Sequence, residues 1–152
     1  MSGPTDALDL DRQICFPLYA ATRAMTRRYT ELLAPVGLTY PQYLVMLALW
    51  SDGDLTVGAL GRRLSLDSGT LTPLLKRLEA AGLVDRRRDP EDERRVVVSP
   101  TRAGHDLRAA VAHVPAGIAA SLVMERADAV ALRRILAELV STLDPQGEPV
   151  VR

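Results

Sequence analysis

The sequence has little of what metal-dependent and cofactor-dependent enzymes need. It contains one cysteine and only two histidines, His105 and His113, which lack the cysteine and carboxylate arrangement of a zinc site. It also has no glycine-rich phosphate loop and no serine, histidine and aspartate set. The sequence therefore predicts no metal, no cofactor and no enzyme of these kinds.

Long apolar runs are missing as well. No run approaches the ~20 apolar residues that span a bilayer, and residues 1–6 lack the basic and apolar regions of a signal peptide. These absences predict a cytoplasmic protein with no membrane contact. With 47% apolar and 25% charged residues, residues 1–152 are expected to form a single domain with its own core.

Lysine is the third scarcity. The chain has nineteen cationic and nineteen acidic residues, and Lys76 is the only lysine. A chain of zero net charge can bind DNA if its cations cluster, and arginine suits bidentate contacts with phosphate and guanine. The places where arginines gather therefore decide whether nucleic acid is a partner.

Residues 55–101 follow the order of a winged helix-turn-helix unit. Thr56 is placed to cap a short helix, and Asp67 or Ser68 to cap a second one whose apolar face comprises Leu71, Leu74, Leu75 and Leu78. The opposite face carries small, hydroxyl and cationic groups that suit a major groove lined by phosphates. We therefore predict that DNA is contacted by Ser68, Thr70, Thr72, Pro73, Lys76 and Arg77.

Pro73 leaves two interpretations of this second helix open. A proline beyond the first turn removes a backbone hydrogen bond and crowds the carbonyl four residues earlier. That residue is Gly69, which leaves room for a local bend, so one helix with a loosened first turn is favoured. The alternative is a helix that begins near Pro73.

A charged hairpin follows. Gly82 is expected to end the second helix in the left-handed conformation, and residues 83–88 and 94–98 are predicted to form a two-stranded wing around an acidic turn. Arginines on both sides, including Arg86 and Arg94, suit a narrow minor groove. A solvated surface is the alternative, but the position of the run after two suitable helices favours double-stranded DNA.

The segments outside this unit contain more apolar helix than a monomeric winged domain needs. Amphipathic patterns cover residues 8–35 and 104–143, most strongly at Leu132, Ile135, Leu136, Leu139, Val140 and Leu143. A two-fold dimer would bury them and present two recognition helices to successive turns of DNA. The alternative is a monomer with one larger core. The predicted fold is mainly α, with a small β-hairpin wing and terminal dimerisation helices.

Cys15 is the candidate for redox chemistry. A lone cysteine is most often a small buried hydrophobe. However, Pro17 fits the first position of a helix, which would place Cys15 just outside a helix N-terminus, where the dipole favours a thiolate. Apolar surroundings for an organic substrate would come from Phe16, Leu18 and Tyr19, and phenolic donors to the sulfur from Tyr29, Tyr40 and Tyr43.

The spacing along this helix places a limit on the site. If one straight helix runs from Cys15 to Tyr29, fourteen residues separate them by ~21 Å. The two side chains then cannot touch within one chain. A dimer with antiparallel N-terminal helices would bring Tyr29 of one chain to Cys15 of the other.

Several segments resemble the MarR family. Residues 55–57, 66–77 and 92–94 look like its recognition-helix and wing sequences, and residues 13–16, Tyr29 and residues 38–43 resemble its organic hydroperoxide resistance repressors, the OhrR subfamily. The similarity runs from about Leu10 to about Leu143. It implies a homodimeric repressor of the one-cysteine type, whose Cys15 thiolate is held by tyrosines matching Tyr29 and Tyr40 from the partner subunit.

The resemblance also implies a signal. An organic hydroperoxide would oxidise Cys15 to a sulfenate, and the dimer would then leave its operator. In one branch of the family a second cysteine captures the sulfenate, but this sequence has none. The oxidised Cys15 must therefore react with a small-molecule thiol or be oxidised further.

Three other functions stay open at this point. A MarR-like regulator controlled by a small ligand would still leave DNA in a Cys15→Ser variant. A cysteine peroxidase would consume hydroperoxide steadily, although it would lack a resolving cysteine and leave the winged unit without a role. A protein-binding winged domain would show no salt-dependent binding to duplex DNA.

Overall fold

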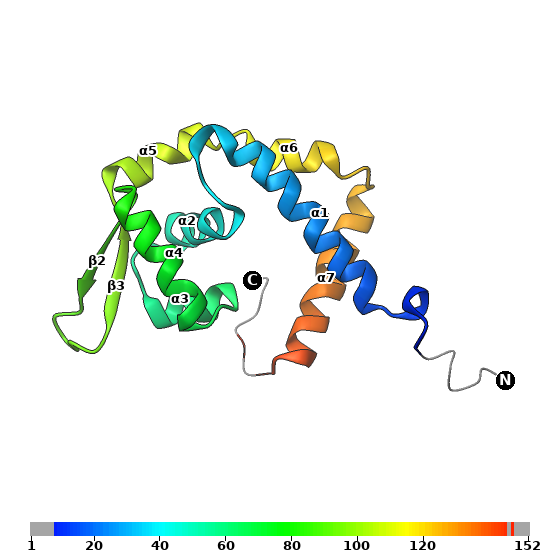
Figure 1. Ribbon diagram of the computed structural model, residues 1–152, viewed down its shortest axis with the longest axis horizontal. Helices are drawn as coiled ribbons and strands as arrows, with labels where there is room; N and C mark the ends of the chain where they lie inside the picture. The colour runs from blue at the N-terminus through cyan, green and yellow to red at the C-terminus, as the bar shows by residue number, and fades with distance from the viewer. Residues whose placement is uncertain (1–7, 146, 148–152) are drawn as a thin grey trace.

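The computed structural model describes residues 8–145 and 147. A three-stranded antiparallel sheet stands at one end of the molecule, and the long helix α1 extends toward the other (Figure 1). The elements in chain order are the 3-10 helix η2 (Leu10–Arg12), α1 (Cys15–Leu33), the 3-10 helix η3 (Ala34–Val36), α2 (Tyr40–Asp52), β1 (Leu55–Thr56), α3 (Val57–Leu64), α4 (Ser68–Ala80), β2 (Val84–Arg88), β3 (Val96–Pro100), α5 (Arg102–Ala110), α6 (Val114–Ser121) and α7 (Arg126–Leu143).

The core is built around α2, which contacts α1, α3, α4 and β3. Its start is well defined, because the Thr39 N–H donates to Gln42 Oε1 and the Gln42 N–H donates to Thr39 Oγ1, which is a capping box. Val45, Met46 and Leu49 are almost completely buried. Helix α2 therefore joins α3, α4 and the sheet to α1.

The helix-turn-helix pair forms as predicted. The side chain of Thr56 caps α3 by accepting a hydrogen bond from the Ala59 N–H, and Asp67 caps α4 by accepting one from the Thr70 N–H. On the inner face of α4, the buried residues are Leu71, Leu75 and Leu78, while Leu74 is half-buried.

Helix α4 runs without a break from Ser68 to Ala80, with Pro73 inside it. The interpretation as one helix is confirmed, and a helix that begins near Pro73 is wrong. Gly82 follows with φ +71°. The N–H groups of Gly82 and Leu83 donate to the carbonyls of Glu79 and Leu78, the Schellman arrangement that ends a helix.

The predicted two-stranded wing is confirmed: β2 and β3 pair antiparallel, with Arg86 opposite Val98. β1 pairs with the other edge of β3, so that the strand order is β1-β3-β2. This third strand was not predicted. β1 has only two residues, too few for the alternating pattern that identifies a strand in a sequence.

Helix α1 begins at Cys15, so this cysteine is the first helical residue and not a residue outside the helix. The prediction is wrong by two positions because it put Pro17 at the start. Pro17 is the third residue of α1, still within the first turn, where no intrahelical N–H is needed. The helix ends at Leu33, and the 3-10 helix η3 follows it directly.

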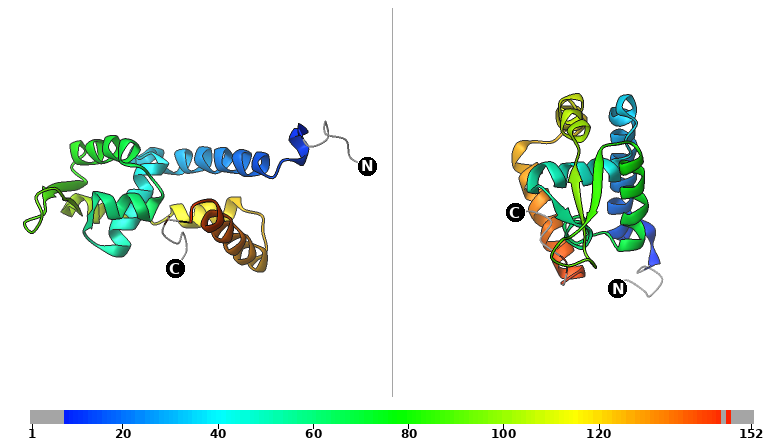
Figure 2. Two further views of the ribbon diagram at one scale, coloured as in Figure 1. Left: turned by 90° about the horizontal axis from the view of Figure 1, so that it is seen from below. Right: turned by 90° about the vertical axis from the view of Figure 1, so that its left-hand side faces the viewer.

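The apolar series from Leu107 to Leu122 divides between two helices. α5 ends at Ala110 and α6 begins at Val114. Pro115 lies in the first turn of α6 and has no N–H to donate to the Val111 carbonyl, so the helix cannot continue unchanged through this point. α6 lies beside α1 (Figures 1 and 2).

Helix α7, all of which the structure describes, contains no buried residue. Its exposed apolar residues include Val130, Leu132, Ile135 and Leu143. Taken singly, no helix within residues 8–145 is long and apolar enough to cross a membrane. Two helix pairs pass that length and composition test only when joined across bends of 74° and 102°.

Candidate redox site and DNA-reading surface

Cys15 is exposed at the first position of α1. The start of a helix has unpaired backbone N–H groups and the positive end of the helix dipole. The side chains of Phe16 and Tyr19 are 39% and 59% exposed. In the part of the chain that the structure describes, the two predicted substrate-pocket residues thus lie near Cys15 on an open surface.

The predicted tyrosines gather at the other end of α1. The rings of Tyr29 on α1 and Tyr40 on α2 are stacked, with centroids 3.9 Å apart and an angle of 10° between them. The ring of Tyr43 lies 5.8 Å from that of Tyr29. Tyr29, Tyr40 and Tyr43, which the sequence offers as phenolic donors, therefore lie in one cluster.

The environment of these phenols keeps them protonated. Burial, together with the neighbouring Tyr29 phenol, raises the pKa of Tyr40 to about 12. Burial also raises the pKa of Tyr29 and of Tyr43. A protonated phenol can donate a hydrogen bond, so the cluster suits an anionic acceptor at neutral pH.

The structure does not bring Cys15 to these tyrosines within one chain. Cys15 and Tyr29 lie fourteen residues apart on the same helix, which corresponds to ~21 Å along its axis. Figure 1 shows α1 as a single extended helix over this distance. A site that contains Cys15, Tyr29 and Tyr40 therefore requires two chains.

Arg23 is a neighbour of the redox segment that the sequence reasoning missed. Its Nη1 lies 3.4 Å from the Tyr19 hydroxyl, and its guanidinium carbon lies 5.7 Å from the centre of that ring. The sequence pattern that indicates this contact is a four-residue spacing. It places Cys15, Tyr19 and Arg23 on one face of a helix.

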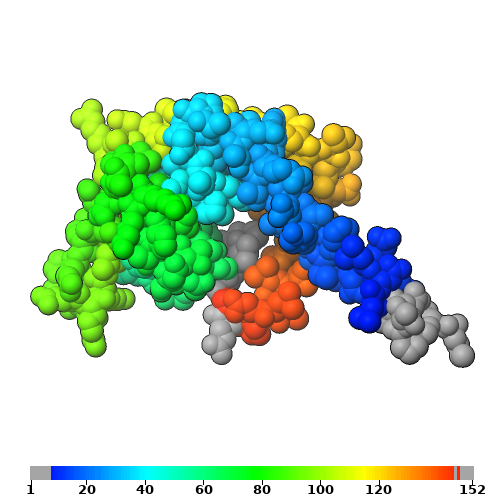
Figure 3. Space-filling view, in the orientation of Figure 1, coloured from blue at the N-terminus to red at the C-terminus, as the bar shows by residue number. Residues whose placement is uncertain are grey.

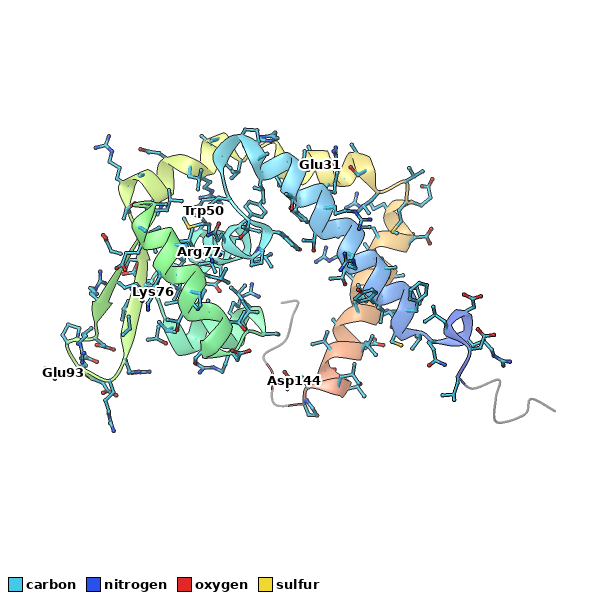
Figure 4. The ribbon with its side chains drawn as sticks, in the orientation of Figure 1. Glu31, Trp50, Lys76, Arg77, Glu93 and Asp144 are labelled. Atoms are coloured by element: carbon cyan, nitrogen blue, oxygen red, sulfur yellow. The ribbon has the colours of Figure 1, made fainter. Side chains whose placement is uncertain are left out.

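At the opposite end of the molecule, the predicted recognition residues form an exposed surface on α4. Exposed positions are Ser68, Thr70, Pro73, Lys76 and Arg77, and Thr72 is half-buried. Figure 4 labels Lys76 and Arg77 on this helix and Glu93 at the tip of the wing. In the space-filling view, α3, α4 and the wing form a lobe distinct from the arm made by the first half of α1 (Figure 3).

Thr70 also has a structural task. Its N–H and its hydroxyl donate to the two carboxylate oxygens of Asp67, at 2.8 and 3.1 Å. These hydrogen bonds lower the pKa of Asp67, so the cap is charged at neutral pH. Asp67 thereby fixes the beginning of the recognition helix.

A cationic cavity of about 530 Å³ lies between α4 and the wing. Its lining includes the hydroxyl residue Thr72 and the arginines Arg62, Arg86, Arg94 and Arg95. An exposed guanidinium group of this lining, such as that of Arg94, suits the phosphates of a duplex.

The two predicted wing arginines lie in different environments. The Arg94 side chain is 92% exposed near the wing tip, 3.3 Å from Asp92. The Arg86 side chain is 25% exposed, and its Nε and Nη2 lie 3.0 and 2.6 Å from Glu79 Oε2. Arg94 projects into solvent, whereas Arg86 bridges β2 and α4. The sequence shows both as wing arginines, and it carries no local signal that Glu79 pairs with Arg86.

Comparison with known proteins agrees with this architecture. The model of the MarR family matches residues 38–96. The chain is 43% identical over 143 residues to the organic hydroperoxide resistance transcriptional regulator of Bacillus subtilis, a match that covers 94% of this chain and 97% of that one. It is 37% identical over 132 residues to the transcriptional regulator SarZ of Staphylococcus saprophyticus, with 87% and 90% covered.

Solved structures of AbfR, a protein of Staphylococcus epidermidis, give the same result in three dimensions. Reduced AbfR bound to DNA aligns with a TM-score of 0.77 at 37% identity and covers 89% of this chain and 92% of that chain. Overoxidised AbfR bound to DNA also aligns with a TM-score of 0.77, at 35% identity over 93% of this chain and 98% of that chain. From its winged helix-turn-helix, its sequence and these relatives, the chain belongs to the MarR family.

Proposed function

We propose that this protein is a redox-sensing transcriptional repressor. It binds double-stranded operator DNA as a homodimer in the cytoplasm, and it is released when an organic hydroperoxide oxidises Cys15. One observation carries the proposal: the only cysteine is exposed at the start of α1, and the other half of α1 carries Tyr29, which stacks on Tyr40 of α2. Two antiparallel copies of α1 complete the site twice.

The proposed dimer uses segments 8–35 and 104–143. Large apolar side chains are exposed on both, at Ile14 and Phe16 in the first and at Leu132 and Ile135 in the second. A second copy of the chain would cover such surfaces, because a two-fold interface pairs the same patch from each subunit. The pairing would leave residues 55–101 of each chain available to one half-site.

In this dimer the exposed face of α4 enters the major groove. Lys76 and Arg77 supply cations for phosphates and bases, and Thr72 supplies a hydroxyl. Arg94 reaches the minor groove from the wing. The support for this assignment is the joint exposure of Lys76, Arg77 and Arg94 on one lobe.

The proposed signal is a two-electron oxidation. The Cys15 thiolate attacks the distal oxygen of the hydroperoxide, so an S–O bond forms and the O–O bond breaks. The sulfur becomes a sulfenate, and the reduced peroxide takes a proton and leaves as an alcohol. The partner's Tyr29 and Tyr40 donate hydrogen bonds that favour the thiolate. A small-molecule thiol then condenses with the protonated sulfenate to give a mixed disulfide and water.

A duplex-binding assay on the DNA upstream of the gene tests the proposal. Wild type and Cys15→Ser should bind about equally when reduced, and cumene hydroperoxide should release only the wild type. Cumyl alcohol, which has the same shape without the peroxide bond, should release neither. Release of Cys15→Ser by the hydroperoxide, or of wild type by the alcohol, would show control by ligand binding instead.

A further inference from the structure

We propose that Glu79 and Arg86 are positioning residues that set the angle of the wing against the recognition helix. Arg86 then supports DNA binding through that geometry and does not itself bind a phosphate. The inference rests on the proposed function in one respect, namely that duplex DNA is the ligand.

The pair joins the recognition helix directly to the wing. Glu79 lies in the last turn of α4, and Arg86 is the third residue of β2. One oxygen of Glu79 accepts hydrogen bonds from two nitrogens of Arg86, at 3.0 and 2.6 Å. Bonding through two nitrogens restricts rotation of the guanidinium as well as its distance. The pair therefore spans the Gly82 turn and holds the helix and the strand in one arrangement.

Arg86 lies on the inner side of its strand. Successive residues of a strand point to opposite faces, and Arg87 pairs with Asp54 at 2.8 Å. The Arg87 and Asp54 side chains are 58% and 46% exposed, compared with 25% and 38% for Arg86 and Glu79. Arg86 is also opposite Val98, which is fully buried. Arg86 is thus held against the body of the molecule, and its neighbour is held at the surface.

Glu79 is a carboxylate at neutral pH. The hydrogen bonds and the positive charge of Arg86 lower the pKa of Glu79 below its usual range. A carboxylate beside a DNA-reading surface repels phosphates. Glu79 is explained at this position if the wing geometry that it maintains strengthens DNA binding more than its negative charge weakens it.

The angle between the wing and α4 determines where the wing tip lies. Arg94 lies beyond the paired strands, which end at Arg88 and Val96. A small rotation of β2 at Arg86 displaces the tip by a larger amount, and Arg94 then no longer meets the groove that α4 selects. The pair and Arg94 therefore act together in DNA binding by different means.

The salt dependence of duplex binding distinguishes the positioning role of Glu79 and Arg86 from phosphate binding by Arg94. It is measured on the reduced full-length protein. Glu79→Gln and Arg86→Gln should each weaken binding about tenfold, the size expected for a hydrogen bond between charged groups. The slope of log affinity against log salt should not change. Arg94→Gln should lower that slope by about one for each phosphate that Arg94 neutralises in the wild type.

Matched variants distinguish geometry from charge. Asp54→Asn removes the same charge as Glu79→Gln from the exposed pair of the wing, and it should not weaken binding. The double variant Glu79→Gln/Arg86→Gln should bind no worse than Arg86→Gln alone, because each single change already breaks the same ion pair. Circular dichroism should show unchanged helix content in all of them.

Direct binding of a phosphate by Arg86 predicts different results. Glu79→Gln would then bind more tightly, and Arg86→Gln would lower the salt slope by about one; either result overturns the inference. If Glu79→Gln does not fold, Arg86→Lys decides, since it keeps the charge but cannot bond through two nitrogens: weaker binding supports positioning, and unchanged binding opposes it. Wild type that fails to bind any duplex would instead overturn the proposed function.

Discussion

The proposed DNA-reading unit, residues 55–101, and helix α7 both carry apolar stripes at helical spacing, but the unit buries its stripes and α7 does not. In the reading unit, Leu60, Leu71 and Leu75 are fully buried. Along α7, Arg126–Leu143, nothing is buried. The difference teaches that a helical apolar stripe indicates a surface that needs cover without indicating whether the same chain supplies it.

Helix α5 directly follows residues 55–101 and packs against β3. The Thr101 hydroxyl donates to the Gly82 carbonyl at 2.6 Å, and the Trp50 indole N–H donates to the Gly104 carbonyl at 3.0 Å. These bonds attach α5 to the end of the recognition helix and to α2. The apolar side chains of the reading unit are therefore covered within the same chain, whereas those of α7 remain exposed.

The largest expected effect comes from disrupting the packing of α5 against the buried core. A Cβ at Gly104 would clash with the Leu83 carbonyl oxygen and would lie 3.2 Å from Met46 Cε. Gly104→Ala should therefore lower the free energy of unfolding by about 3 kcal/mol, as overpacking does. Chemical denaturation measures it, with Gly58→Ala as control, whose Cβ would lie 3.6 Å from Arg62 Nη1. Equal stability of Gly104→Ala and wild type would contradict this account.

The next prediction concerns the exposed apolar surface of α7. Ile135 is 50% exposed on α7, so Ile135→Glu should leave the fold intact and prevent dimerisation. Operator affinity should fall about 100-fold, because two linked half-sites no longer bind together. Arg133→Ala, about half a turn away, is the control. Sedimentation gives the oligomeric state; a dimeric Ile135→Glu protein would show that α7 serves another purpose.

A mixed dimer sharpens the comparison at the redox site, where the two chains are proposed to meet. One chain carries Cys15→Ser and the other carries Tyr29→Phe, so the only remaining Cys15 faces an intact Tyr29. That thiol should be oxidised by hydroperoxide at the wild-type rate. The Tyr29→Phe homodimer should react more slowly, because its thiolate lacks one hydrogen-bond donor. Equally slow oxidation of the mixed dimer would place the tyrosine and the cysteine in one chain.

The smallest expected effect concerns Tyr40. Its pKa is raised to about 12, so the folded state favours the neutral phenol. The associated stability is complete below about pH 10 and is lost as the pH rises from about 10 toward 12. Ultraviolet titration of tyrosinate should show a last step near pH 12 in the wild type and none in Tyr40→Phe. A last step near pH 10 in the folded wild type would mean that the cluster is solvated.

Several elements were predictable because their causes are local. Thr56 and Asp67 cap α3 and α4, and Gly82 ends α4 with a positive φ. Each depends on a hydrogen bond or a backbone preference within a few residues, so the sequence signal is sufficient. The continuity of α4 through Pro73 followed from the glycine four residues earlier.

Other features were not predictable from any local pattern. β1 exists because Leu55 meets Val98 across the sheet, and Arg86 differs from Arg94 because Glu79 lies across a turn from it. Cys15 was placed outside the helix because Pro17 is accepted at more than one position of a first turn. In each case the local sequence does not show the neighbour that decides the structure, or the residue at which the helix begins.

By itself, the sequence determined the order of the reading unit, the single redox-capable residue and the apolar stripes of the terminal helices, since composition and helical spacing suffice for these. The tertiary structure alone decided which stripes are buried, which arginine is held by a carboxylate and that the tyrosines stack on each other. The physical reason is that caps and periodicity act over one or two turns of the chain, whereas burial and ion pairing depend on residues that only folding brings together.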